Sequence, residues 1–260
     1  MPVGEGCVKC RCAMLSMHGT RQHCRRAWNR CARGCLPSPA RRPHYRAMMT
    51  MTPAAAAPDW ASLYDGFIAE LRTRGTGSSA PRLGDRLEPF VLPNSSGRYV
   101  ALDDLLGAGP IVLNFIRGGW CPYCRAELAA WAAAIPRLEA VGGRLIAVSS
   151  EIGGRAETTR CSLAPGAEML CDVDHGLATA LGLTSIVGEA VHDAYRGAGL
   201  DLADIYGDTG RLLPIPATFV IAGDGTVRYA FVEPDFRIRA DPAVVIAVVE
   251  ALGVTARPYS

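Results

Sequence analysis

The sequence predicts an α/β fold in which helices flank a central mixed β-sheet. The β-branched run Ile111–Ile116 has the composition of a strand buried on both faces, and it leads into a helical pattern that extends to about Glu139. A second buried run follows at Leu145–Val148, so the order of strand, helix and strand predicts a βαβ unit with parallel strands. Further along, Thr218–Ile221 and Val227–Val232 flank an Asp-Gly turn and predict an antiparallel hairpin. Parallel and antiparallel pairs in one sheet make that sheet mixed.

The segment before the βαβ unit predicts a helix and a small hairpin. Apolar residues recur at steps of three and four from Asp59 to Arg74, a spacing typical of an amphipathic helix. A Gly/Ser-rich break follows at residues 75–80. The short runs Phe90–Leu92 and Arg98–Leu102 then flank a polar turn, which predicts a hairpin. These elements form an N-terminal extension to the sheet.

The segment after the βαβ unit predicts shorter elements and a closing helix. Met169–Val173 has a strand pattern, and helical patterns cover Gly176–Leu181 and Gly188–Arg196. Pro242 begins a final helix rich in Val and Ala, which ends near Leu252. Because the sequence has no internal repeat, we predict one folded domain.

Charge and cysteine content divide the chain into a tail and a body. Residues 1–50 hold ten Lys and Arg and a single acid, Glu5, and they include six of the ten cysteines. We expect residues 1–50 to be a disordered Cys/Arg-rich extension or to reflect a wrongly assigned start. Residues 51–80 are expected to form a linker and the amphipathic helix, and residues 81–255 the folded domain. The alternatives for the tail are a metal-binding or nucleic-acid-binding arm and an organelle-targeting leader.

Composition argues against several classes of protein. Beyond residue 50 the chain holds 17 basic and 24 acidic side chains, a net charge of −7, so we expect no nucleic-acid partner. The longest apolar runs fall short of the roughly 18 residues that a membrane span requires, so no membrane partner is expected. The N-terminus lacks the continuous apolar region of a secretory signal, which predicts a cytoplasmic protein.

The motif that carries chemistry is Cys121-Pro122-Tyr123-Cys124, preceded by Trp120, where a buried strand gives way to a helix. The first N–H groups and the dipole of a helix favour an anion, so a thiol there ionises more readily. In Cys-x-x-Cys motifs this lowers a pKa from about 8.5 to roughly 3.5–7.5. We therefore predict Cys121 as the attacking sulfur and Cys124, one turn along the same face, as the resolving one. Half of a zinc site is the structural alternative, but no second pair of ligands follows.

Residues 114–128, with the sequence Asn-Phe-Ile-Arg-Gly-Gly-Trp-Cys-Pro-Tyr-Cys-Arg-Ala-Glu-Leu, resemble the active-site block of the alkyl hydroperoxide reductase/thiol-specific antioxidant (AhpC/TSA) superfamily. The similarity is to its peroxiredoxin-like branch with a thioredoxin-style Cys-x-x-Cys. Gly84-Asp85 resembles the family's entry segment, Pro214–Ile221 its cis-proline strand, and Tyr229–Asp235 its closing strand. The resemblance covers about residues 82–252.

The resemblance implies a thioredoxin-like fold and a thioredoxin-dependent, peroxiredoxin-type oxidoreductase. Its substrates would be hydrogen peroxide or organic hydroperoxides, and thioredoxin or another dithiol would reduce the Cys121–Cys124 disulfide. The resemblance also implies a cis peptide bond before Pro216, which would pack against the sulfurs near Thr218. No metal or organic cofactor is expected, and the protein would be a monomer or homodimer. Trp120 and Tyr123 are expected to shape the surface on which the reductant docks.

Two departures from the family keep other functions open. Peroxiredoxins place Thr three residues before the reactive cysteine and Arg in a late strand, whereas this chain has Gly118 and Pro216 at those positions. Arg117 either supplies the missing guanidinium or is a solvated residue at a strand end. The alternatives are a thioredoxin- or glutaredoxin-like thiol–disulfide oxidoreductase without peroxide preference, and a redox-sensing or metal-binding protein that uses the N-terminal cysteines.

Overall fold

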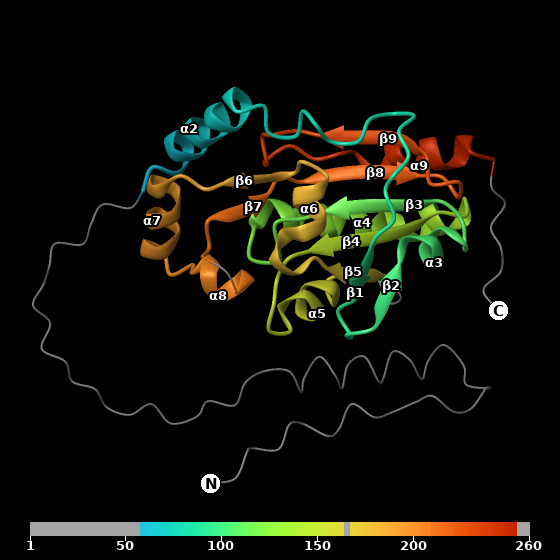
Figure 1. Cartoon of the computed structure of the whole chain (residues 1–260), viewed down its shortest axis with the longest axis horizontal. Coiled ribbons are helices and arrows are strands. Elements are labelled where there is room, and N and C mark those ends of the chain that lie inside the picture. The colour runs from blue at the N-terminus through green and yellow to red at the C-terminus, as the bar shows by residue number, and fades with distance from the viewer. Residues whose placement is uncertain (1–57, 164–166, 208, 254–260) are drawn as a thin grey trace, which may run out of the picture. The chain divides into compact units, whose positions relative to one another are not determined.

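A computed structural model describes residues 58–163, 167–207 and 209–253 of the 260-residue chain (Figure 1). These residues fall within one compact unit. The predicted features of residues 1–50, including the six N-terminal cysteines, lie outside the described residues. Within the described part, no helix is both long and apolar enough to cross a lipid bilayer.

A five-stranded mixed sheet forms the centre of the fold, as the sequence predicted. Its strand order is β5-β4-β3-β8-β9, in which β3, β4 and β5 run parallel, β8 is antiparallel to β3, and β9 is antiparallel to β8. The five strands are β3 (Ile111–Phe115), β4 (Arg144–Ser149), β5 (Glu168–Cys171), β8 (Ala217–Ile221) and β9 (Val227–Val232).

Side chains of the central strand alternate between two hydrophobic cores, because successive residues of a strand point to opposite faces. Ile111, Leu113 and Phe115 of β3 lie in one core, and Val112 and Ile116 lie in the other. All five are at most 1% exposed. The predicted burial of this strand on both faces is therefore confirmed.

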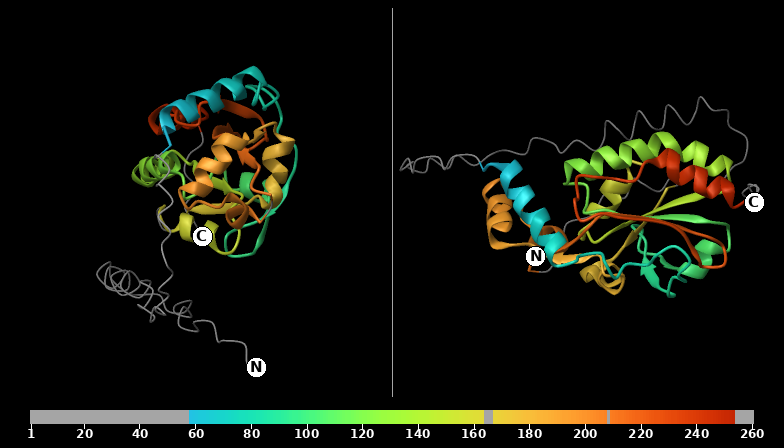
Figure 2. Two further views of the ribbon diagram at one scale, coloured as in Figure 1. Left: turned by 90° about the vertical axis from the view of Figure 1, so that its left-hand side faces the viewer. Right: turned by 90° about the horizontal axis from the view of Figure 1, so that it is seen from above.

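Helices α4 (Pro122–Ala140) and α9 (Pro242–Ala251) lie together over one face of the sheet (Figure 2). Both helices were predicted within two residues of these bounds. The core between them and the sheet contains Leu128, Trp131 and Val249. Helix α4 follows β3 directly, so its first turn is placed at the end of a central, fully buried strand.

The opposite face carries the N-terminal helix and several short elements. Helix α2 buries Phe67, Ile68 and Leu71 in the same core as β3, and it lies beside α7 (Figure 2). The elements of this face and of the edges are α2 (Trp60–Thr73), β1 (Val91–Pro93), β2 (Tyr99–Ala101), α3 (Leu102–Leu106), α5 (Arg155–Arg160), α6 (Gly176–Ala180), α7 (Glu189–Gly197) and α8 (Leu202–Tyr206).

Several short elements went unpredicted because none spans enough residues for a periodic pattern to show. They include α3, α8 and the two strands of a small sheet, β6 (Thr184–Ile186) and β7 (Leu212–Pro214). Leu102, which we expected to end a strand, begins α3 instead.

The expected cis peptide bond before Pro216 is wrong, because the described residues contain no cis peptide. Pro216 is buried and trans, in the link between β7 and β8. The N–H of Ile215 donates to the carbonyl of Leu183 at 2.7 Å, so this stretch continues the β6–β7 pairing almost to the start of β8.

Candidate active site

The two cysteines of the motif occupy the first turn of α4, as predicted. Cys121 is the N-cap residue, with extended φ and ψ of −79° and 123°, and Pro122 is the first helical residue. Proline suits that position because its missing N–H would have no partner within the helix. Both sulfurs are free thiols, and Cys121 is 1% and Cys124 0% exposed. The site is thus a reduced, almost fully buried dithiol.

The surroundings of Cys121 favour its thiolate. The Cys124 thiol donates a hydrogen bond that lowers the pKa of Cys121, and this outweighs the opposing effect of burial. The positive charges of Arg117 and Arg239 lower it further. Its place at the start of α4 acts in the same direction. Cys121 is therefore the more nucleophilic sulfur of the pair.

Cys124 has the opposite character. Complete burial raises its pKa, and the hydrogen bond that it donates to Cys121 raises it further. Two nitrogens nevertheless approach its sulfur: the backbone N–H of Arg117 at 3.3 Å and Nη2 of Arg239 at 3.4 Å. Of the two thiols, Cys124 is thus the one that keeps its proton. The Arg117 N–H and Arg239 Nη2 can stabilise a negative charge on its sulfur when that proton is lost.

Arg117 is a buried residue of the site, so the alternative of a solvated arginine is wrong. The residue is 2% exposed, and its guanidinium carbon lies 4.8 Å from the ring centre of Trp120 and 4.2 Å from that of Phe236. Its Nη2 donates to the Tyr195 hydroxyl at 3.0 Å. Aromatic faces attract a cation, most strongly where water is excluded. This packing holds a permanent positive charge near Cys121.

The aromatic residues around Arg117 come from distant parts of the chain. Tyr195 lies on α7, and Phe236 follows β9. Trp60 of α2 stacks on Tyr195 with ring centres 5.5 Å apart, and Tyr64 of α2 meets Phe236 edge to face at 5.1 Å. Helix α2 thereby closes the active-site arginine off from solvent.

Trp120 and Tyr123 flank the cysteines and are both half-buried. The indole Nε1 of Trp120 donates to the Tyr206 hydroxyl at 2.8 Å, and that hydroxyl donates to the Arg117 carbonyl. Tyr123 packs edge to face against Phe236, with ring centres 6.0 Å apart. Both rings are partly exposed, and their role in docking the reductant stays a prediction.

A buried carboxylate, which sequence reasoning missed, fixes the loop before Cys121. Glu151 is 4% exposed and accepts hydrogen bonds from the Gly119 N–H at 3.1 Å, the Ser149 hydroxyl at 3.0 Å and the Thr159 hydroxyl at 2.8 Å. It lines a cavity of about 400 Å³ together with Trp120 and Gly119. Glu151 follows β4, so only the three-dimensional pairing of β3 with β4 brings it beside this loop.

The loop accommodates glycine and little else. At Gly118 the backbone has φ of +132°, and an added Cβ would lie 2.8 Å from the Glu151 carboxyl carbon and 2.9 Å from the Trp120 ring. The threonine that peroxiredoxins carry at this position does not fit here. Glycine at position 118 is therefore required by the packing of this loop.

We expect Gly119→Ala to destabilise the protein by about 1–3 kcal/mol through overpacking. The new Cβ would lie 2.4 Å from the Thr159 hydroxyl, so Thr159 must move and lose its hydrogen bond to Glu151. Gly66→Ala is the matched control, because its Cβ meets nothing within 4 Å on α2 and alanine favours the helix. Urea unfolding of both variants measures the difference, and equal midpoints would contradict the packing of this loop.

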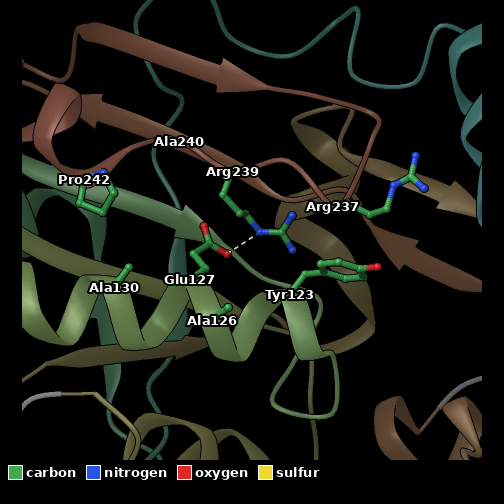
Figure 3. A pocket seen from close by; sticks show the side chains of 8 residues that line it. All are labelled: Tyr123, Ala126, Glu127, Ala130, Arg237, Arg239, Ala240 and Pro242. Carbon is green, nitrogen blue, oxygen red and sulfur yellow. Dashed lines mark hydrogen bonds and ion pairs between the residues drawn. The ribbon is translucent and has the colours of Figure 1, made fainter.

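A second pair of residues that sequence reasoning missed lies beside Cys124. Arg239 Nε contacts Glu127 Oε2 at 2.7 Å, and the side chains are 12% and 2% exposed (Figure 3). Glu127 lies one turn beyond Cys124 on α4, and residues at this spacing share one face of a helix. Arg239 lies in the segment after β9, and no local pattern marks it.

Thr218, predicted as a supporting residue of the site, bonds to the central strand. Its hydroxyl donates to Asn114 Oδ1 at 2.7 Å, across the pairing of β8 with β3. Burial raises the pKa of Glu127, while Arg239 and the Asn114 amide oppose that effect. The contact of Thr218 is thus with Asn114 in the central strand.

Within the described residues, no group of three or more His, Cys, Asp or Glu side chains is arranged to hold a metal ion. The metal-binding alternative rests on the N-terminal cysteines, which lie outside the described residues. Of the four cysteines in the described residues, Cys121 and Cys124 are the two that lie at a helix N-terminus.

A mixed sheet with a Cys-x-x-Cys at the first turn of the helix after its central strand defines a thioredoxin-fold protein with a dithiol site. Residues 83–230 match the AhpC/TSA family, more than half of the chain, so this protein belongs to that family. No curated protein matches the sequence.

Solved peroxiredoxins share the fold. The structure of the peroxidoxin BcpB from Mycobacterium tuberculosis is 22% identical, with 66% of this chain and 98% of that chain covered and a TM-score of 0.50. A cysteine-to-serine mutant of PrxQ from Xylella fastidiosa is 15% identical, with 68% and 99% covered and a TM-score of 0.53. A cysteine-to-serine mutant of peroxiredoxin 6 of Arenicola marina is 21% identical, with 68% and 75% covered and a TM-score of 0.52. At these identities the likeness establishes the thioredoxin fold.

Proposed function

We propose that the protein is a thiol-dependent peroxidase that reduces hydrogen peroxide or organic hydroperoxides. The Cys121 thiolate attacks the terminal oxygen of the O–O bond and becomes a sulfenic acid, while the leaving oxygen takes a proton and departs as water or alcohol. Cys124 then attacks the sulfenic sulfur, which forms the Cys121–Cys124 disulfide and releases water. Two electrons pass from the dithiol to the peroxide.

One observation carries this proposal: the thiolate of Cys121 is favoured at a helix N-terminus beside the buried cation of Arg117. The family's own arginine position holds Pro216, and the proposal gives the role of that arginine to Arg117. A positive charge there both maintains the thiolate and stabilises negative charge that develops on the peroxide oxygen.

The reductant in this proposal is thioredoxin or another dithiol. The two cysteines are one helical turn apart, so the oxidised product is an intramolecular disulfide. A dithiol reduces such a bond by exchange: its thiolate attacks one sulfur, and its second thiol resolves the mixed disulfide. The half-buried rings of Trp120 and Tyr123 flank the cysteines, which supports them as the surface that the reductant meets.

We expect reduced full-length protein to show a rapid fluorescence change on mixing with hydrogen peroxide, with a rate proportional to peroxide concentration. Trp120 adjoins Cys121 and should report its oxidation. Stopped-flow mixing with hydrogen peroxide and separately with an organic hydroperoxide would rank the substrates. A reaction no faster than that of free cysteine with the same hydroperoxide would contradict the proposed peroxidase activity.

A thiol–disulfide oxidoreductase without peroxide preference is the second candidate. It is favoured by the steric exclusion of threonine at Gly118, which removes one of the two groups that polarise peroxide in the family. In that case small disulfides would oxidise Cys121 faster than any hydroperoxide at equal concentration.

A further inference from the structure

Arg239 links the buried sulfur of Cys124 to a carboxylate. One edge of its guanidinium contacts Cys124 Sγ at 3.4 Å through Nη2, and Nε contacts Glu127 Oε2 at 2.7 Å. Nη1 donates to the carbonyls of Phe236 and Ile238. Every nitrogen of the guanidinium thus has a partner. Figure 3 shows the pair with Glu127.

The neighbouring Arg237 offers a contrast on the same chain segment. Its guanidinium is held by Asp235 at 2.8 Å and 2.9 Å and by Asp65 at 2.8 Å, with no contact to either sulfur. Both arginines line a pocket of about 240 Å³ with Tyr123, yet in Figure 3 only Arg239 points toward Glu127. The two arginines thus share a chain segment and a pocket, and Arg239 alone of the two contacts Cys124.

We propose that Arg239 is a positioning residue for the second step of the reaction: its guanidinium, anchored by Glu127, holds Cys124 and stabilises it as the thiolate that closes the disulfide. The inference rests on the proposed function. A fully buried thiol ionises reluctantly, since charge is costly away from water. A cationic donor already in contact with the sulfur offsets that cost without rearrangement. When the reductant attacks Cys121, the same contact stabilises Cys124 as the leaving thiolate.

The groups that face Cys124 come from four elements. Cys121 and Glu127 lie on α4, the Arg117 N–H on the loop after β3, Arg239 after β9, and Tyr206 on α8. The last is a buried hydroxyl whose pKa burial raises well above 10.0, so it stays neutral over the working range. Arg239 is the one side-chain cation in contact with the Cys124 sulfur among these groups.

The test separates the two chemical steps on a single peptide. Trypsin cleaves after Arg117 and Arg125, and the resulting peptide, residues 118–125, contains Cys121 and Cys124 and no other cysteine. Rapid quenching of full-length protein after mixing with hydrogen peroxide, with dimedone as the sulfenic-acid trap, followed by mass spectrometry gives both rates. The first is loss of the dithiol, and the second is formation of the disulfide.

In Arg239→Gln we expect disulfide formation to slow about ten- to hundredfold, with its pH profile moved toward higher pH, because a charged hydrogen bond to the thiolate is lost. Formation of the sulfenic acid should change far less, since Arg239 lowers the pKa of Cys121 less than Cys124 and Arg117 do. Arg239→Lys should recover part of the loss by restoring the charge. Arg237→Gln, the matched control, should leave both rates and the pH profile unchanged.

Disulfide formation that is unchanged in Arg239→Gln at every pH would overturn the inference, as would an equal slowing in Arg237→Gln. Oxidised glutathione serves as a second oxidant, because it forms a mixed disulfide on Cys121 that Cys124 must resolve. If wild-type protein does not react with peroxide but reacts with oxidised glutathione, the peroxidase proposal fails. The role of Arg239 is then tested by the rate at which Cys124 resolves the mixed disulfide. If an Arg239→Gln protein does not fold, Arg239→Lys is measured instead: a partial slowing of disulfide formation is expected there, because the planar guanidinium contacts are lost, and the wild-type rate would overturn the inference.

Discussion

Replacing Cys121 by serine is expected to abolish the rapid reaction with hydroperoxide and leave only background oxidation. Serine keeps the shape of the N-cap but ionises far outside the working pH range, so no anion remains to attack the O–O bond. Neither the fold nor the start of α4 should suffer, because serine is itself a preferred N-cap residue. Stopped-flow fluorescence measures the loss, and an unchanged melting temperature shows that the site alone is affected.

Cys124→Ser is the matched variant, and its expected behaviour is different. The first oxidation should persist, because Cys121 remains, and the sulfenic acid should accumulate for want of a resolving thiol. Since the Cys124 thiol donates the hydrogen bond that most lowers the pKa of Cys121, the rate at acidic pH should fall somewhat. Dimedone labelling of residues 118–125 detects the trapped species. Loss of the first oxidation here, with its survival in Cys121→Ser, would reverse the two roles.

The sequence predicted the parts of this molecule that depend on local patterns. The βαβ unit is visible because Ile111–Ile116 and Leu145–Val148 are continuous buried runs of strand length. The position of Cys121 follows from the change of periodicity after β3 together with Pro122, which is favoured at a helix start. Both features are set by residues close together in the chain, so neither required the tertiary structure.

The surroundings of the sulfurs depend on residues that meet only in the folded chain. Arg239 lies 115 positions from Cys124, and Glu151 lies 32 positions from Gly119, yet both pairs are in contact. The burial of Arg117 was not foreseen, since its cover comes from Tyr195 and Phe236. Phe236 and Arg239, like α2, also lie outside the residues that match the family, 83–230. Segments beyond the shared family region thus complete the electrostatic environment of the dithiol.

Arg117→Gln is expected to alter the reaction with hydroperoxide in two separable ways. The positive charge of Arg117 lowers the pKa of Cys121, so its loss raises that pKa. As the pH falls, the variant therefore loses its thiolate at a higher pH than wild-type protein does. The fall in rate on acidification should therefore begin at higher pH. If Arg117 also stabilises charge on the peroxide oxygen, the plateau rate at alkaline pH should drop about tenfold or more. Rates measured from about pH 4 to about pH 9 resolve both effects.

Two controls separate charge from packing. Arg117→Lys keeps the charge but loses the planar contact with the Trp120 and Phe236 rings. The pH at which the rate falls on acidification should therefore stay close to that of wild-type protein, while the plateau rate at alkaline pH should drop. Arg137→Gln removes an exposed charge from the last turn of α4 and should change neither. If Arg117→Gln shifts the fall in rate on acidification but leaves the plateau rate unchanged, the role of Arg117 is limited to lowering the pKa of Cys121. A profile identical to wild-type protein would show that another group replaces the family's missing arginine, and the peroxidase proposal would lose its central observation.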